Sequence, residues 1–285
     1  MPTLIPLKTA HRSHARPSTL TILLGGISLA TCANLALAAE NDSIVTDRPD
    51  FVESSQVVGK GHFQIETSVS RETNRTKNTT TNEKTTLIST PTLLRFGISE
   101  HWEARIETDG RIWLKNEQNG VQQTSSGWAD TSLGLKWALQ EGDEKTGKVG
   151  IGLLLHADLA SGSRDLRGQG VRPSVRLVAE WEFANEVSLG LMPGIVLDKN
   201  AAGQRFNSAL FGAVLGKGLN DNWRVFVELA ASQIASSRNG GNVVTLDLGS
   251  AYLINKHTQI DAVITRGLNK NTPDWNIGTG LSIKF

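Results

Sequence analysis

The residues of this chain that could do chemistry are charged side chains spaced two apart along apolar runs. Glu103, Arg105 and Glu107, for example, alternate with apolar or small residues. Side chains two apart lie on the same face of a β-strand, so these charges share one face, where they can pair or line a polar path. The residues in such positions are Glu66, Arg95, Glu103, Arg105, Glu107, Asp130, Lys136, Asp158, Arg176, Glu180, Glu182, Arg224, Glu228, Asp247 and Asp261.

Motifs for catalysis are weak. A lipid hydrolase would need a nucleophile activated by a base, but His156, two residues before Asp158, falls on the charged face, which favours a structural role. Residues 142–148 match most of a phosphate-binding loop, yet Val149 replaces the required Ser or Thr. The remaining histidines show no metal-ligand spacing. We therefore predict that the protein is not an enzyme and carries no metal or cofactor.

Composition narrows the class of protein further. The 285 residues carry a formal net charge of +1, which gives no sign of a nucleic-acid partner. After the first forty residues, no apolar stretch is long enough for a transmembrane helix. A chain of this kind can span a membrane only as a closed β-barrel, because every backbone polar group in lipid needs a partner.

The N-terminus reads as a secretory signal peptide over residues 1–39. A basic start precedes an apolar run, and residues 36–38 form an Ala-Leu-Ala cleavage site. The single cysteine, Cys32, lies within this segment, so the processed chain is expected to contain no disulfide. We predict a periplasmic N-terminal segment over residues 40–60 and a barrel over residues 61–285.

The stretch from Trp275 to Phe285 organises the predicted barrel. Alternate residues are apolar, with Thr279 as the exception, and those between them are polar or small. Its length suits a transmembrane strand of about nine to eleven residues. A final strand that ends in phenylalanine resembles the assembly signal of Gram-negative outer-membrane barrels, which gives Phe285 that predicted role.

The same alternation recurs along the chain and predicts about twelve antiparallel strands in an up-and-down transmembrane barrel. Short connections alternate with longer polar ones, which we expect near residues 73–84, 114–127, 160–172, 199–205, 235–242 and 268–274. Tryptophans near the strand ends are typical of interfacial girdles. A water-soluble sandwich remains the alternative, with the charges on its outer face. The facing of residues 206–218 stays open, because both faces are small or apolar.

The most specific motif precedes the strands. Residues 46–55 read Thr-Asp-Arg-Pro-Asp-Phe-Val-Glu-Ser-Ser, with Asp47, Arg48, Pro49, Asp50 and Glu53 as the distinctive positions. This motif, together with residues 59–66, 90–97 and 130–137, resembles the outer-membrane family of meta-pathway phenol-degradation (MetA-pathway) transporters. The resemblance implies a barrel and a role in moving hydrophobic or aromatic compounds.

Three functions follow as hypotheses. The first is a channel or transporter for small, aromatic or hydrophobic molecules, and the second is a structural barrel with a plugged lumen. The third and weakest is an outer-membrane lipid hydrolase. We expect a monomer in the Gram-negative outer membrane with both termini in the periplasm, whose partners are membrane lipid, the barrel-assembly machinery and a small-molecule substrate. The segment over residues 46–55 either folds into the lumen and narrows it or forms a periplasmic tail.

Overall fold

The computed structural model describes residues 43–77, 82–200 and 202–285. The predicted signal peptide and its cleavage site lie outside these residues. Within the described ranges, no helix is long and apolar enough to cross a membrane.

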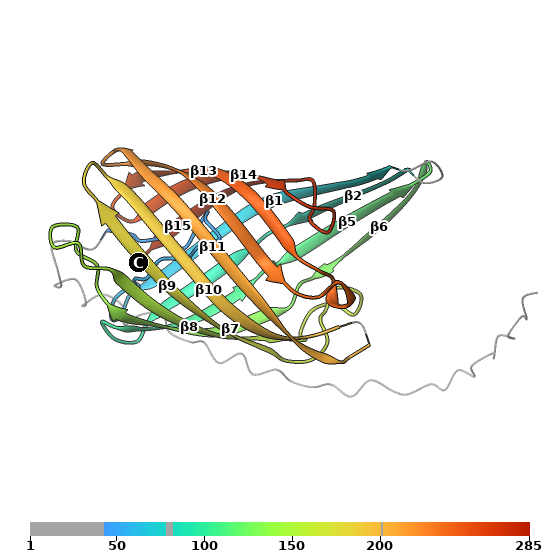
Figure 1. Cartoon of the computed structure of the whole chain (residues 1–285), viewed down its shortest axis with the longest axis horizontal. Coiled ribbons are helices and arrows are strands. Elements are labelled where there is room, and N and C mark those ends of the chain that lie inside the picture. Colours follow the sequence, from blue (N-terminus) through green and yellow to red (C-terminus); the bar gives the residue numbers. More distant parts are fainter. Residues whose placement is uncertain (1–42, 78–81, 201) are drawn as a thin grey trace, which may run out of the picture. The chain divides into compact units, whose positions relative to one another are not determined.

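Antiparallel strands form one sheet that closes on itself, because β15 pairs with β1 (Figure 1). The strands are β1 (Phe63–Lys77), β2 (Asn82–Ser89), β3 (Thr92–Gly97), β4 (Trp102–Thr108), β5 (Arg111–Gln118), β6 (Val121–Trp128), β7 (Thr131–Gln140), β8 (Gly150–Leu159), β9 (Arg172–Phe183), β10 (Val187–Lys199), β11 (Arg205–Asn220), β12 (Trp223–Ile234), β13 (Val243–Asn255), β14 (Thr258–Gly267) and β15 (Trp275–Lys284). A single-turn 3-10 helix, η1, spans Ser237–Asn239.

Three long strands are interrupted at neighbouring positions. β2 and β3 are separated by residues 90–91, β4 and β5 by 109–110, and β6 and β7 by 129–130. When each interrupted pair is counted as one strand, the barrel has twelve strands, which confirms the predicted class and number. Pro91 lacks the N–H that a ladder requires, and Gly110 has φ of 67°, a conformation that suits glycine. These residues explain two of the interruptions.

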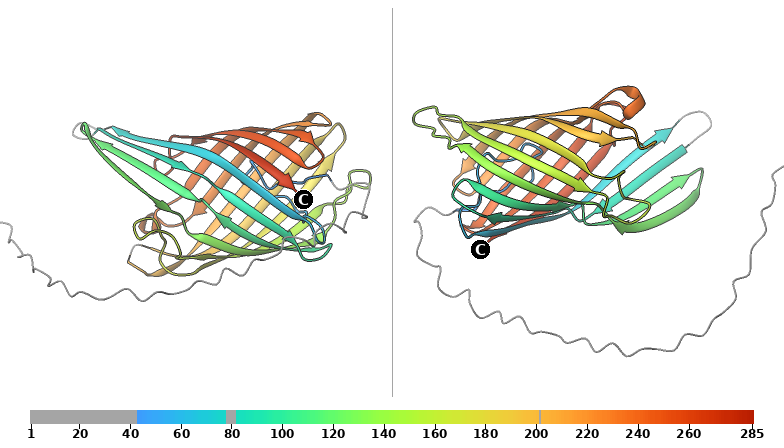
Figure 2. Two further views of the ribbon diagram at one scale, coloured as in Figure 1. Left: turned by 180° about the vertical axis from the view of Figure 1, so that it is seen from behind. Right: turned by 90° about the horizontal axis from the view of Figure 1, so that it is seen from below.

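The outer parts of the interrupted strands continue as an extension that consists of the end of β1 with β2, β5 and β6. Figure 2 shows this extension reaching past the other strands. The predicted long loops at 73–84 and 114–127 are therefore wrong over most of their length, because strand residues fill them. β5 and β6 are joined by a tight turn at Asn119-Gly120, whose φ values are 50° and 84°, as in a type I′ hairpin.

The arrangement of polar and apolar residues is the reverse of that in a water-soluble protein. Gln64, Glu66 and Arg95 face the barrel interior and are fully buried, whereas Val69 and Ile277 point outward and are 54% and 57% exposed. In β11, residues 208, 210, 212, 214 and 216 are buried, which settles the facing that the sequence left open. An apolar outer face around a charged interior is the arrangement of a barrel that faces lipid.

Aromatic side chains mark both ends of the apolar outer face. Trp102 stacks on Trp137 with ring centroids 4.9 Å apart at the short-turn end. Trp113, Trp128 and Trp275 are exposed at the end that carries the long connections. This is the expected position of the two interfacial girdles. We call these two ends the turn end and the loop end.

The barrel closes at the turn end through the C-terminal residue. The backbone N–H of Phe285 donates to the carbonyl of Phe63 at 2.8 Å, and that of Phe63 donates back at 3.2 Å. Their rings stack with centroids 5.9 Å apart. Phe285 therefore joins the last strand to the first.

Candidate functional site

The described residues that precede β1 lie inside the barrel. Residues 43–62, which we call the lumen segment, run through the interior near the turn end (Figure 1). Their hydrogen-bond partners come from β1, β3, β4, β7, β9, β12 and β14, that is, from around the whole wall. A segment that contacts strands on all sides occupies the lumen, so the alternative of a periplasmic tail is wrong.

Asp47 is at the centre of the most buried ion-pair cluster. Its carboxylate accepts hydrogen bonds from Arg105 Nη1 at 2.6 Å and from Lys136 Nζ at 2.8 Å, and Arg95 Nη1 lies 3.4 Å away. Burial alone would raise the pKa of Asp47, but the charges of Arg95, Lys136 and Arg105 hold that pKa far below its usual value. Asp47 therefore binds the lumen segment as a charged carboxylate.

Carboxylates of the wall complete this cluster. Arg95 Nε donates to Glu103 at 2.9 Å, and its Nη1 donates to Glu66 at 3.0 Å. Glu66 in turn accepts the backbone N–H of Asp47 at 3.0 Å, and Glu103 accepts that of Val58 at 2.9 Å. The wall thus pairs with the Asp47 carboxylate and with the backbone N–H groups of Asp47 and Val58, as buried polar groups require.

Glu53 and two wall glutamates hold the middle of the segment. Glu53 pairs with Arg105 and with Arg176, each at 2.6 Å. Glu228 accepts the backbone N–H groups of residues 51 and 52 at 2.8 and 2.7 Å. Glu180 accepts the N–H of residue 55 at 2.6 Å.

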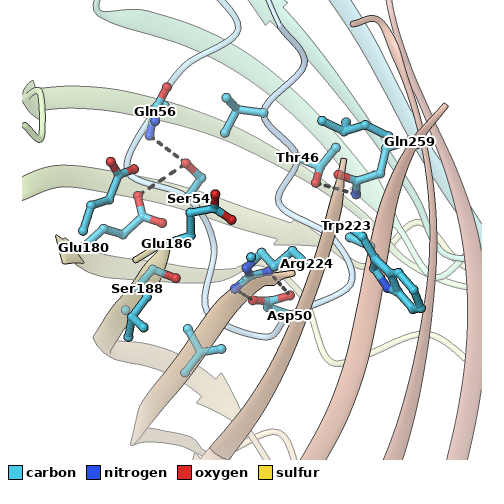
Figure 3. Close-up of a pocket in the computed structure, with 18 of the residues that line it drawn as sticks. Thr46, Asp50, Ser54, Gln56, Glu180, Glu186, Ser188, Trp223, Arg224 and Gln259 are labelled. Atoms are coloured by element: carbon cyan, nitrogen blue, oxygen red, sulfur yellow. Dashed lines mark hydrogen bonds and ion pairs between the residues drawn. The ribbon is translucent and has the colours of Figure 1, made fainter. Parts of the chain in front are cut away.

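Arg48 and Asp50, which flank Pro49 in the sequence, contact the opposite part of the wall. Arg48 Nη2 lies 3.2 Å from Asp261 Oδ1 on β14. Both carboxylate oxygens of Asp50 accept from Arg224 on β12, as Figure 3 shows. Figure 3 also shows Thr46 beside Gln259, whose side-chain amide donates to its hydroxyl at 2.8 Å.

An apolar cluster fixes the segment from another side. Val52 is buried against inward-facing residues of β8 to β12 that include Leu154, Met192 and Val214. A Cβ on Gly212 would lie 2.6 Å from the Val52 side chain, so glycine is needed there for the segment to approach β11. Apolar residues on the interior face of these strands therefore have a partner inside the barrel.

Two cavities lie on either side of the Arg48–Asp50 stretch, and both are lined by Arg48 and Asp50. The turn-end cavity, about 470 Å³, also includes Glu186 and Asn222 from short turns (Figure 3). The loop-end cavity, about 410 Å³, includes Glu72 and Asn276. Residues 48–50 therefore separate two polar cavities inside one barrel.

Five of the predicted interior residues form no hydrogen bond or ion pair with the described residues of the segment. Glu107 lies 3.4 Å from His156 Nδ1, which places this buried histidine in a structural pair. Asp130 and Asp158 both approach Arg172, at 3.0 and 3.6 Å, and Asp130 also accepts backbone N–H groups of residues 162 and 168, so it fixes a loop at the rim. Glu182 lines the turn-end cavity and Asp247 lines the loop-end cavity.

Two neutral residues that bind the segment were not predicted. Gln64 donates to the carbonyl of Val45 at 2.9 Å, and Gln259 binds Thr46. Their positions on the inward face could have identified them, because each alternates with the apolar outer residues of its strand. Among the described residues, no group of three His, Cys, Asp or Glu side chains is arranged to hold a metal ion.

Comparison with known families identifies the chain at the level of sequence. Residues 46–285 match the model of the family described as "Putative MetA-pathway of phenol degradation". The match begins at the lumen segment and confirms the resemblance that the motif over residues 46–55 indicated. The comparison with curated proteins finds no match.

Solved structures show similarity in fold. An outer membrane channel from Pseudomonas putida F1 superposes with a TM-score of 0.59 at 9% sequence identity, over 81% of this chain and 98% of the other. The KdgM porin in complex with disordered oligogalacturonate gives 0.48 at 11% identity, over 78% of this chain and 99% of the other. At 9% identity, the similarity to the Pseudomonas putida channel concerns the fold alone.

Proposed function

Since the chain belongs to the family described as "Putative MetA-pathway of phenol degradation", we propose that it is an outer-membrane channel for small aromatic or hydrophobic molecules. The observation that carries this proposal is the pair of cavities separated by residues 48–50. Each cavity contains apolar as well as charged residues. A small molecule can enter from either end, and the lumen segment controls passage between them.

The lumen segment is suited to this control because its contacts are graded. The Asp47 cluster and its arginine partners are almost fully buried. In contrast, the side chain of Arg224, which holds Asp50, is 35% exposed, and that of Arg48 is 19% exposed. Breaking an ion pair that water reaches costs less than breaking a buried one, because water solvates the separated charges. Residues 48–50 can therefore shift while Asp47 keeps the segment anchored.

The same features support a proposed location and orientation. The apolar outer face and the two aromatic girdles suit the outer membrane of a Gram-negative cell. Both chain ends are proposed to face the periplasm, because short turns do so in barrels of this kind. The remaining partners that we propose are membrane lipid and the barrel-assembly machinery, with the protein as a monomer.

Planar-bilayer conductance tests the proposal. We expect the processed protein to conduct weakly and a variant that lacks residues 46–55 to conduct more strongly, because the deletion joins the two cavities. On denaturing gels, unboiled samples of both proteins should migrate differently from boiled samples, which marks a folded barrel. A folded deletion variant with no conductance would reject the channel and favour the structural barrel with a plugged lumen.

A further inference from the structure

The loop-end cavity has an excess of negative charge that the wall does not neutralise. Four carboxylates line it, those of Asp50, Glu72, Asp109 and Asp247, against one guanidinium, that of Arg48. Arg48 and Asp50 are already bound to Asp261 and Arg224. Among the residues that the structure describes, no ion-pair partner is present for the other three carboxylates.

A second observation concerns hydrogen bonding and is independent of charge. Ser68 and Asp247 both line this cavity, and each residue is only 6% exposed. The two atoms of interest are Ser68 Oγ and Asp247 Oδ1. Neither atom has a hydrogen-bond partner within the described ranges, and the same is true of Asn276 Oδ1. The other oxygen of Asp247 accepts from Thr245 at 3.2 Å, which fixes the carboxylate in place. Buried acceptors of this kind require donors.

Part of the remaining lining is apolar. Phe51 of the lumen segment, Leu87, Ile112 and Val263 line it together with the acceptors. Its volume of about 410 Å³ lies within the range of small-molecule pockets, about 300–1,000 Å³. A suitable ligand would place an apolar body against these side chains and a donor group against the carboxylates.

From these observations we propose that the loop-end cavity binds small amphipathic cations, namely protonated primary amines that carry an aromatic or aliphatic body. An ammonium group provides three donors and the positive charge that the cavity lacks. A divalent metal fits less well, because no three acidic or histidine side chains of the described chain converge on one point. The inference rests on the proposed function and specifies its ligand class.

Titration calorimetry with the processed protein in non-ionic micelles tests this site, with benzylammonium as the probe and benzyl alcohol as its neutral counterpart. We expect benzylammonium to bind and benzyl alcohol to bind much more weakly. Asp247→Asn keeps the shape and removes the charge, so it should weaken benzylammonium binding by about tenfold or more, the effect of losing one charge-assisted hydrogen bond. Glu72→Gln is a second variant with the same expected direction.

Glu117→Gln is the matched control, because Glu117 lies on β5 outside both cavities. The site is rejected if benzyl alcohol binds as tightly as benzylammonium, or if the control weakens binding as much as Asp247→Asn does. A barrel that conducts but does not bind benzylammonium overturns this inference alone. If the intact protein binds benzylammonium but the folded variant that lacks residues 46–55 does not conduct, the proposed function alone is overturned.

Discussion

Arg224 holds both carboxylate oxygens of Asp50, with 3.1 Å from Nη1 to Oδ1 and 2.6 Å from Nη2 to Oδ2. This two-point contact joins the lumen segment to β12 at the boundary between the two cavities. It is also the most exposed of the ion pairs that hold the segment, with 35% of the Arg224 side chain accessible. Asp50 and Arg224 therefore form the contact that should open first.

Asp50→Asn should raise the single-channel conductance, because it weakens this contact and leaves the buried Asp47 cluster intact. Arg224→Gln should act in the same direction. The control is Arg266→Gln at the loop end, an exposed residue whose partner Asp274 is 3.9 Å away. Equal conductance of Asp50→Asn and the unchanged protein would show that residues 48–50 do not limit passage.

A disulfide between the segment and the wall should lock the channel closed. A Cβ built on Gly190 lies 4.0 Å from the Cβ of Val52, within the range of about 3.5–4.5 Å that disulfides require. The double variant Val52→Cys, Gly190→Cys requires a slight shift of the Val214 side chain. In this variant, oxidation should lower the conductance and reduction should restore it. Val52→Cys alone is the control. Conductance that is independent of reductant in the cross-linked protein would contradict a moving segment.

The Asp47 cluster makes a specific prediction about pH. A carboxyl whose pKa is lowered in the folded state stabilises that state above its unfolded pKa, and the stabilisation is lost as pH falls through the folded pKa. The usual value is 3.8, and the three cations hold the folded pKa far below it. Docking through Asp47 should therefore be unchanged between pH 7 and about 4. Conductance recorded across this range checks the prediction, and a rise near pH 5 would contradict it.

Asp47→Asn should release the segment at neutral pH. It leaves Arg105 and Lys136 short of a buried counter-charge, and loss of one partner in a buried pair costs about 3–5 kcal/mol. We expect protease to cut the segment in the assembled variant but not in the unchanged protein. Asp143→Asn, in a short turn, is the control. Full protection of Asp47→Asn would mean that the remaining contacts suffice.

Deletion of Phe285 should reduce the amount of assembled barrel, because the residue joins β15 to the start of β1 and stacks on Phe63. The measurement is the fraction of outer-membrane protein that migrates differently on a denaturing gel when the sample is left unboiled. Phe285→Tyr, which keeps the ring, should assemble normally. Wild-type amounts of the deletion variant would remove the role of Phe285 as an assembly signal.

Alternation in the sequence was enough to predict the barrel and its number of strands. It failed for residues 82–86 and 122–126, because these strand residues are polar on both faces and show no hydrophobic period. Asn119-Gly120 was a local hairpin signal within the region expected to be a loop.

The partners of the lumen segment could not be predicted in the same way. Asp47 and Glu53 were recognised as special, but the cations that they meet depend on how the strands are staggered around the barrel. No local pattern encodes that stagger. Arg105, which binds both Asp47 and Glu53, was one of several equivalent inward cations in the sequence.

The lumen segment precedes every strand, yet its partners extend from Glu66 on β1 to Asp261 on β14. Its binding site therefore does not exist until the strands that carry these residues have come together. The first described residues of the chain are the last that can become ordered. An incompletely closed barrel lacks part of the site and cannot hold the segment, so docking of residues 43–62 reports that the wall is complete.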